Sequence, residues 1–163
     1  MFIAHLPAGY VLSSFLQRKS ARFALLAGSI APDIDLIYFY TFGQRAVVHH
    51  AYATHMPWFW IICCLCGIIL ARLCKKNMDT LFLAFFGGTM LHLFLDSFTG
   101  GIHWLAPLSD TELIFFTVPS VHSHWTLNFI LHWTFWLEII IILIAGILFL
   151  RNSRFTTKKK PQT

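Results

Sequence analysis

The sequence predicts an all-α protein, an integral membrane helical bundle with about five membrane segments, of which the first two could be short or broken. Of the 163 residues, 57% are hydrophobic and only 12% are charged. Soluble domains carry about 25% charged residues, so half that fraction indicates a membrane protein. Three apolar runs are also long enough to cross a bilayer, and the basic residues form short clusters beside apolar segments, as in cytoplasmic loops.

The first two segments contain residues that interrupt a helix. Residues 2–17 are apolar but include His5, Pro7 and Gly9, and residues 23–42 are broken by Pro32. Proline removes a backbone donor and kinks a helix. Each of these segments could therefore span the bilayer, or enter it and return, with its irregular backbone buried in protein or facing a cavity.

Residues 57–74, 80–98 and 126–150 are the three runs expected to span, because a bilayer core needs about 17 to 25 helical residues. We therefore expect one transmembrane domain over residues 1–150 and a basic, disordered cytoplasmic tail over residues 151–163. All four cysteines lie between residues 63 and 74. In such a helix they are interpreted as small packing residues, and not as a redox or metal site.

The basic clusters predict the orientation, because cytoplasmic loops are enriched in Lys and Arg. Five segments with the amino terminus outside and the carboxyl terminus in the cytoplasm place all three clusters inside. The same clusters give no reason to expect a nucleic-acid partner. The clusters are Arg18, Lys19 and Arg22; Arg72, Lys75 and Lys76; and Arg151, Arg154 and residues 158–160.

A possible metal site begins with His92 and Asp96, which lie four residues apart and so on one face of a helix. At about 1.5 Å per helical residue, His5, Asp33 and His92 lie about 20, 17 and 24 Å from the nearest basic cluster. Other histidines fall on the same outer side of the predicted topology. They are His49, His50 and His55 before the third segment, and His103, His122 and His124 in the external connection.

Each residue has an alternative interpretation. His92 and Asp96 could form a simple hydrogen-bonded pair, Asp33 and Asp35 could cap the helix after Pro32, and the histidines could be interfacial. A charged group in a bilayer costs about 3 kcal/mol, however, and a divalent cation would compensate several carboxylates together. Imidazole with carboxylate suits a divalent metal, zinc first, then manganese or iron, in one to three ions.

One further acidic residue, Glu138, lies near the middle of the last apolar run. An ionisable residue in that position is a candidate for function. Pairing with a neighbouring helix is an equally good interpretation.

The order of these motifs resembles the YdjM-like family of small prokaryotic inner-membrane proteins, described as membrane-bound metal-dependent hydrolases. The resemblance covers about residues 1–110 and rests on His5, APDID at 31–35, HHAYATH at 49–55, and HLFLD at 92–96 with Ser97, Thr99 and residues 100–107. The family's second element usually reads HHRGxTH, and Ala51 and Tyr52 replace its Arg and Gly. A looser likeness to zinc-dependent phospholipase C would make His103 a further ligand.

The resemblance implies a hydrolase whose metal ligands are His5, Asp33, Asp35, His50, His55, His92 and Asp96. We expect Asp35 to act as general base, and the substrate to be a phosphoester or lipid-like molecule at the outer-leaflet side of the membrane. Membrane lipid is the expected partner, and the oligomeric state stays open. The alternative is a non-catalytic metal-binding membrane scaffold or partner-binding protein. An ion-translocating protein, with Glu138 in a relay, is a third hypothesis.

Overall fold

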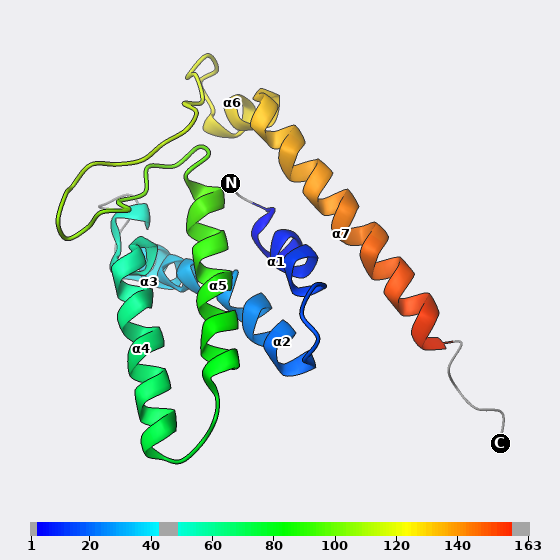
Figure 1. Ribbon diagram of the computed structural model, residues 1–163. Helices are drawn as coiled ribbons and strands as arrows, with labels where there is room; N and C mark the ends of the chain where they lie inside the picture. Colours follow the sequence, from blue (N-terminus) through cyan, green and yellow to red (C-terminus); the bar gives the residue numbers. More distant parts are fainter. Residues whose placement is uncertain (1–2, 43–48, 158–163) are drawn as a thin grey trace.

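The computed structural model describes residues 3–42 and 49–157, with side chains described to residue 153. Over this part of the chain the regular structure is helical, with seven α-helices, three short 3-10 helices and an isolated β-bridge between Ile102 and Leu113. Figure 1 shows α5 between α4 and the amino-terminal helices, with α1 between α5 and the long helix α7. The predicted all-helical class is thereby confirmed for these residues.

The two uncertain amino-terminal segments adopt the short and the broken forms. Helix α1 (His5–Ser13) has nine residues, roughly 14 Å of helix, about half of a bilayer core. The second segment divides into α2 (Lys19–Gly28), the 3-10 helix η1 (Ala31–Ile34) and α3 (Asp35–Thr41). Its two halves meet at 52°, and Pro32 stands just after the break, where it is compatible with the start of a helical turn.

Two of the predicted spans correspond closely to observed helices. They are α4 (Pro57–Leu73) and α5 (Asp79–Asp96), which are antiparallel and joined by a short turn. An ion pair between Arg72 and Asp79 ties the two ends of this turn together. The hydrogen bond from Arg72 holds the pKa of the Asp79 carboxyl below its usual range. The short 3-10 helices η2 (His49–Ala51) and η3 (Ala53–His55) precede α4.

The last predicted span, residues 126–150, is wrong as a single helix. The backbone is extended at His132, where α6 (Trp125–Leu131) ends, and α7 (Trp133–Thr157) begins just after it. The His132 side chain lies 2.8 Å from the Thr134 hydroxyl, a local bond that competes with continuation of the helix. Glu138 consequently lies in the second turn of α7, and α7 continues seven residues past Leu150.

The five-segment topology is not confirmed. Among the described residues, one helix is long and apolar enough to cross a membrane, the part of α7 from Trp133 to Ser153. The bent pair formed by residues 19–28 and 31–41 would add a second span if it acts as one. Helix α4 is apolar but shorter. The depths calculated from the sequence for His5, Asp33 and His92 assume five complete spans, and they are therefore not established.

Close packing of α2 on α5 is the largest helix–helix contact in the described part of the chain. It depends on Gly28 and Gly88, because a Cβ atom at either position would overlap the other helix's backbone at Phe85 or Leu25. Small residues permit such approach between membrane helices. The packing fixes the segment after α2, which includes Pro32 and the acidic residues, against the carboxyl-terminal half of α5.

Candidate metal centre

Histidine and aspartate side chains from four parts of the chain meet beside the carboxyl-terminal end of α5. His92 and Asp96 lie on α5 itself, and His5 is the first residue of α1. Asp33 and Asp35 come from η1 and the start of α3, while His50 and His55 come from η2 and η3. The HxxxD spacing puts two of these side chains on one helix face, and the tertiary fold supplies the rest.

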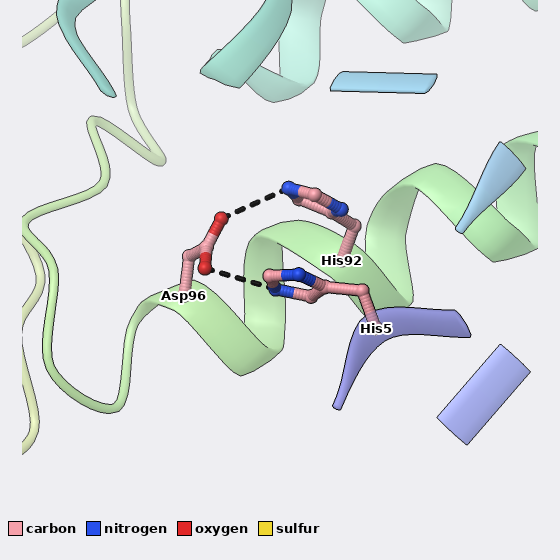
Figure 2. A group of neighbouring side chains, drawn as sticks. All are labelled: His5, His92 and Asp96. Atoms are coloured by element: carbon pink, nitrogen blue, oxygen red, sulfur yellow. Dashed lines mark ion pairs between the residues drawn. The ribbon is translucent and has the colours of Figure 1, made fainter. Parts of the chain in front are cut away.

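Asp96 is the centre of this group. Figure 2 shows its carboxylate beside two stacked imidazoles, with Oδ1 2.9 Å from Nε2 of His5 and Oδ2 3.0 Å from Nε2 of His92. The rings of His5 and His92 stack with their centroids 3.8 Å apart. Nε2 of His55 and of His50 lie 3.6 and 3.8 Å from Oδ2. Four imidazoles therefore lie within 4 Å of one buried carboxylate.

Three overlapping groups have the spacing of metal ligands. Within each group the possible ligand atoms lie within 4.8 Å of one another. In the second group, Asp33 Oδ1 is 3.5 Å from Nε2 of His92 and 3.8 Å from Nε2 of His55. The groups are His5, His92 and Asp96; Asp33, His55 and His92; and His50, His55 and Asp96.

Two of the histidines are oriented through their other ring nitrogen. Nδ1 of His92 donates to the carbonyl oxygen of Ser29 at 2.8 Å, because that oxygen can only accept. Nδ1 of His55 lies 2.7 Å from Oδ2 of Asp35 and donates to the carboxylate in the same way. In the neutral rings, the lone pair is then on Nε2, which faces Asp96 and Asp33. This is the usual outer-shell arrangement of metal-binding histidines.

Asp35 belongs to this supporting layer. Its Oδ2 accepts hydrogen bonds from His55 and from the Thr54 hydroxyl, the latter at 2.7 Å. The Thr54 carbonyl in turn accepts a bond of 2.7 Å from the Trp60 indole. Asp35 occurs in none of the three ligand groups found in the described residues. The chain of contacts connects the site to the start of α4.

The site is almost closed. His5, Asp35, His55, His92 and Asp96 are all buried. Asp33, with 30% of its side chain exposed, and His50, with 17%, form the accessible side. A small molecule or water can therefore approach the carboxylate of Asp33 more readily than that of Asp96.

The chemistry of these donors fits a divalent cation. Nε2 of His5 and of His92 are buried and make no aligned hydrogen bond, although each lies close to an Asp96 oxygen. Such short contacts between Nε2 and a carboxylate oxygen, without hydrogen-bond alignment, are expected where the lone pairs of both atoms face one shared cation. Protonating both stacked rings would instead place two positive charges 3.8 Å apart, which opposes the second protonation. A cation among the nitrogens also compensates the buried carboxylates.

The fold brings together the side chains of all seven predicted site residues, with Asp35 in the outer layer as described above. The other histidines of the predicted outer side lie elsewhere. His103 contacts Asp110 and Glu112, His124 caps α6, and His122 is exposed in the same connection. The side chain of His49 lies outside the described residues.

Sequence reasoning missed the groups that orient the ligands. The Ser29 carbonyl belongs to no recognisable motif, because every residue has a carbonyl. Thr54 lies within the HHAYATH element, but its supporting contact with Asp35 could not be inferred from that motif. Gly100 could have been identified from the sequence, because it lies three residues after the HLFLDS motif, in the segment that resembles the family. A Cβ at Gly100 would overlap the imidazole of His50, so the glycine provides the space for that ring.

The Gly100→Ala variant is expected to displace His50 and to weaken metal binding by about 10-fold, in the range of lost supporting contacts. Gly100 does not have a positive φ, so the substitution tests space and not backbone strain. Competition against a chromogenic chelator measures the affinity. Gly146→Ala, where an added Cβ has no neighbour within 4 Å, is the control. Equal affinities in the two variants would contradict the role given to Gly100.

The family model described as YdjM inner membrane protein matches residues 2–158, nearly the whole chain. The chain therefore belongs to this family and is an inner membrane protein. The match continues beyond residue 110, where the motif resemblance ends, and through α7. No curated protein and no solved structure matches the chain, so the looser likeness to zinc-dependent phospholipase C has no support from these comparisons.

Proposed function

We propose that this member of the YdjM family is a membrane-bound, metal-dependent hydrolase of a phosphoester or lipid-like substrate. The observation that supports it most is the convergence of Nε2 of His5, His55 and His92 on the carboxylates of Asp33 and Asp96. Two of these rings are also held by outer-shell acceptors. Hydrogen-bonded ligands of this kind are a property of metal sites, which a simple ion-pair network does not require.

The ligands proposed are the six residues of the three groups, His5, Asp33, His50, His55, His92 and Asp96. Nitrogen and carboxylate oxygen together suit zinc, with manganese or iron as further candidates. The two oxygens of Asp96 face different imidazoles, and Asp96 would contribute to two of the three ligand groups. A bound divalent cation would supply water of lowered pKa and stabilisation of negative charge on the reacting group.

The protein's own residues have separate roles in this scheme. The contacts of Asp35 with His55 and Thr54 support a positioning role for this carboxylate, in place of the general-base role expected from the sequence. Asp33, one of the proposed ligands, lies on the accessible side, where water can reach its carboxylate. The buried imidazoles exclude bulk water from the opposite side. Substrate would approach past Asp33 and His50.

The site's surroundings support a lipid-like substrate and a position on the outer side of the membrane. Apolar side chains are exposed along α4 and α7, which is the surface a bilayer covers. The site lies at the ends of α4 and α5 farthest from the basic turn at residues 72–76. The positive-inside rule puts that turn in the cytoplasm, so the site would face the outer leaflet, with the amino terminus outside and the carboxyl terminus inside.

A non-catalytic metal-binding scaffold is the second candidate, and the burial of five of the seven residues favours it. Structural metal sites are closed, whereas catalytic ones keep an open coordination position. The two candidates therefore differ in turnover and not in metal content.

The test is elemental analysis of the detergent-purified protein, followed by hydrolysis assays with p-nitrophenyl phosphodiesters and with phospholipid vesicles. The proposal expects at least one tightly bound zinc, manganese or iron per chain, and hydrolysis that chelators abolish. Bound metal without turnover on either substrate class would favour the scaffold. Protein that contains no stoichiometric metal after purification without chelators would refute both.

A further inference from the structure

Glu138 is a fully buried carboxylate outside the metal centre. It lies in the second turn of α7, and its Oε2 accepts a hydrogen bond of 2.6 Å from the backbone N–H of Ile3. The bond joins residues 135 positions apart in the sequence. Burying an ionisable group inside a membrane protein is costly. One hydrogen bond from a backbone N–H offsets only part of that cost. The retention of Glu138 calls for a function that an apolar residue could not supply.

The carboxylate stands at the amino-terminal end of α1. The residue before this helix is Ala4, which provides no side-chain cap, and the first turn contains no acidic residue. The free N–H groups and the positive end of a helix are stabilised by negative charge. Glu138 supplies that charge from another helix. The contact therefore orients the start of α1 relative to α7.

The first residue of α1 is the proposed ligand His5. Ile3 precedes it by two residues, so the chain between the bonded amide and His5 spans at most about 7 Å. Ala4, between them, is completely buried against Leu95, with Leu137 packed on the same cluster. Leu95 adjoins Asp96 and Leu137 adjoins Glu138. The bond and the packing thus fix the same short segment from two directions.

We propose that Glu138 is a positioning residue that holds His5 against Asp96 by anchoring the backbone at Ile3 to α7. In this arrangement α7, which among the described residues is the one helix long and apolar enough to cross a membrane, fixes one ligand of the metal centre. The other ligands come from α5 and the segments around α3 and α4. The inference rests on the proposed metal function. It predicts that loss of Glu138 acts on metal binding only through His5.

A double-mutant cycle with Glu138→Ala, His5→Ala and the combined variant tests this prediction. Affinity for Zn²⁺ is measured by chelator competition, and the ligand set by the visible absorption spectrum of the Co²⁺-loaded protein. Glu138→Ala should weaken Zn²⁺ binding by about 10- to 100-fold, as loss of an outer-shell partner does, and should change the Co²⁺ spectrum in the same way as His5→Ala. In the His5→Ala background it should add less than about 2-fold.

Two further variants guard against a general loss of structure. Glu138→Met keeps the side-chain volume but removes the carboxylate. It should therefore show the expected loss of Zn²⁺ affinity without the cavity that the alanine variant creates. Gly146→Ala, on the same helix at a position where an added Cβ has no neighbour within 4 Å, should leave Zn²⁺ affinity unchanged.

The outcomes separate this inference from the proposed function. Wild-type protein that binds no Zn²⁺ or Co²⁺ overturns both. If His5→Ala weakens binding and neither Glu138 variant does, the metal centre stands and the positioning role is refuted. Additive effects of Glu138→Ala and His5→Ala also refute it, because they would mean that Glu138 acts independently of His5.

Discussion

Replacing Asp96 with Asn is expected to abolish metal binding and any metal-dependent hydrolysis together. Asp96 is the carboxylate that four imidazoles surround, and it belongs to two of the three ligand groups. Asn has the same size but lacks the charge and one acceptor oxygen. We expect affinity for Zn²⁺ to fall by more than about 100-fold, the upper end of the loss caused by an outer-shell change.

Thermal unfolding gives a second measurement of the same variant. A ligand that binds only the folded state stabilises it, so a chelator should lower the Tm of the wild-type protein in detergent. It should leave the Tm of Asp96→Asn unchanged, since no metal is bound there. Asp110→Asn, at an exposed loop position, is the control and should behave as wild type. Full metal content in Asp96→Asn, or a chelator effect of wild-type size, would contradict the central role given to Asp96.

The sequence predicted which His and Asp side chains lie close together better than it predicted the path of the chain. The HLFLD spacing identified a helix face, and the cost of carboxylates in a bilayer indicated that Asp33 and Asp96 need a shared partner. Resemblance to the family then supplied the full set of residues. These signals are local motifs or residue types, and they do not depend on how many segments cross the membrane.

The topology was less predictable because apolar composition does not reveal a break in a helix. Residues 126–150 are uniformly apolar enough to span, yet His132 bonds to Thr134 and separates α6 from α7. The position of Glu138 in its helix therefore differs from the prediction. It lies in the second turn of α7 and not near the middle of a span. Hydropathy left open whether the first segment spans, and the structure has the short form, with His5, Pro7 and Gly9 in a helix of nine residues.

The APDID motif did not predict that Asp33 and Asp35 have different positions and contacts in the site. Both are acidic and two residues apart, so either could face the centre. Pro32 and the 3-10 turn at residues 31–34 decide it, because they place Asp33 on the accessible side of the cluster and start α3 at Asp35. Asp35 then reaches His55 and Thr54 from η3. Such a distinction requires the backbone path after the break.

The contact between α2 and α5 links this backbone path to the metal centre, and Gly88→Ala is expected to disrupt both. The added methyl group would overlap the Leu25 carbonyl and the backbone of Gly28 and Ser29, which cannot rotate away as a side chain can. Overpacking usually costs about 1 to 3 kcal/mol and more against a rigid neighbour. We expect a loss of about 3 kcal/mol or more, seen as a lowered Tm in detergent.

The same displacement would move the Ser29 carbonyl away from Nδ1 of His92, so metal affinity should fall with stability. The adjacent Gly87→Ala is a closely matched control, because an added Cβ there has no neighbour within 4 Å and alanine favours helix over glycine. Gly87→Ala should keep wild-type metal affinity and equal or higher Tm. If Gly88→Ala matches Gly87→Ala in both measurements, α2 does not approach α5 as closely as the structure has it. The proposed orientation of His92 by the Ser29 carbonyl would be contradicted as well, because it depends on that packing.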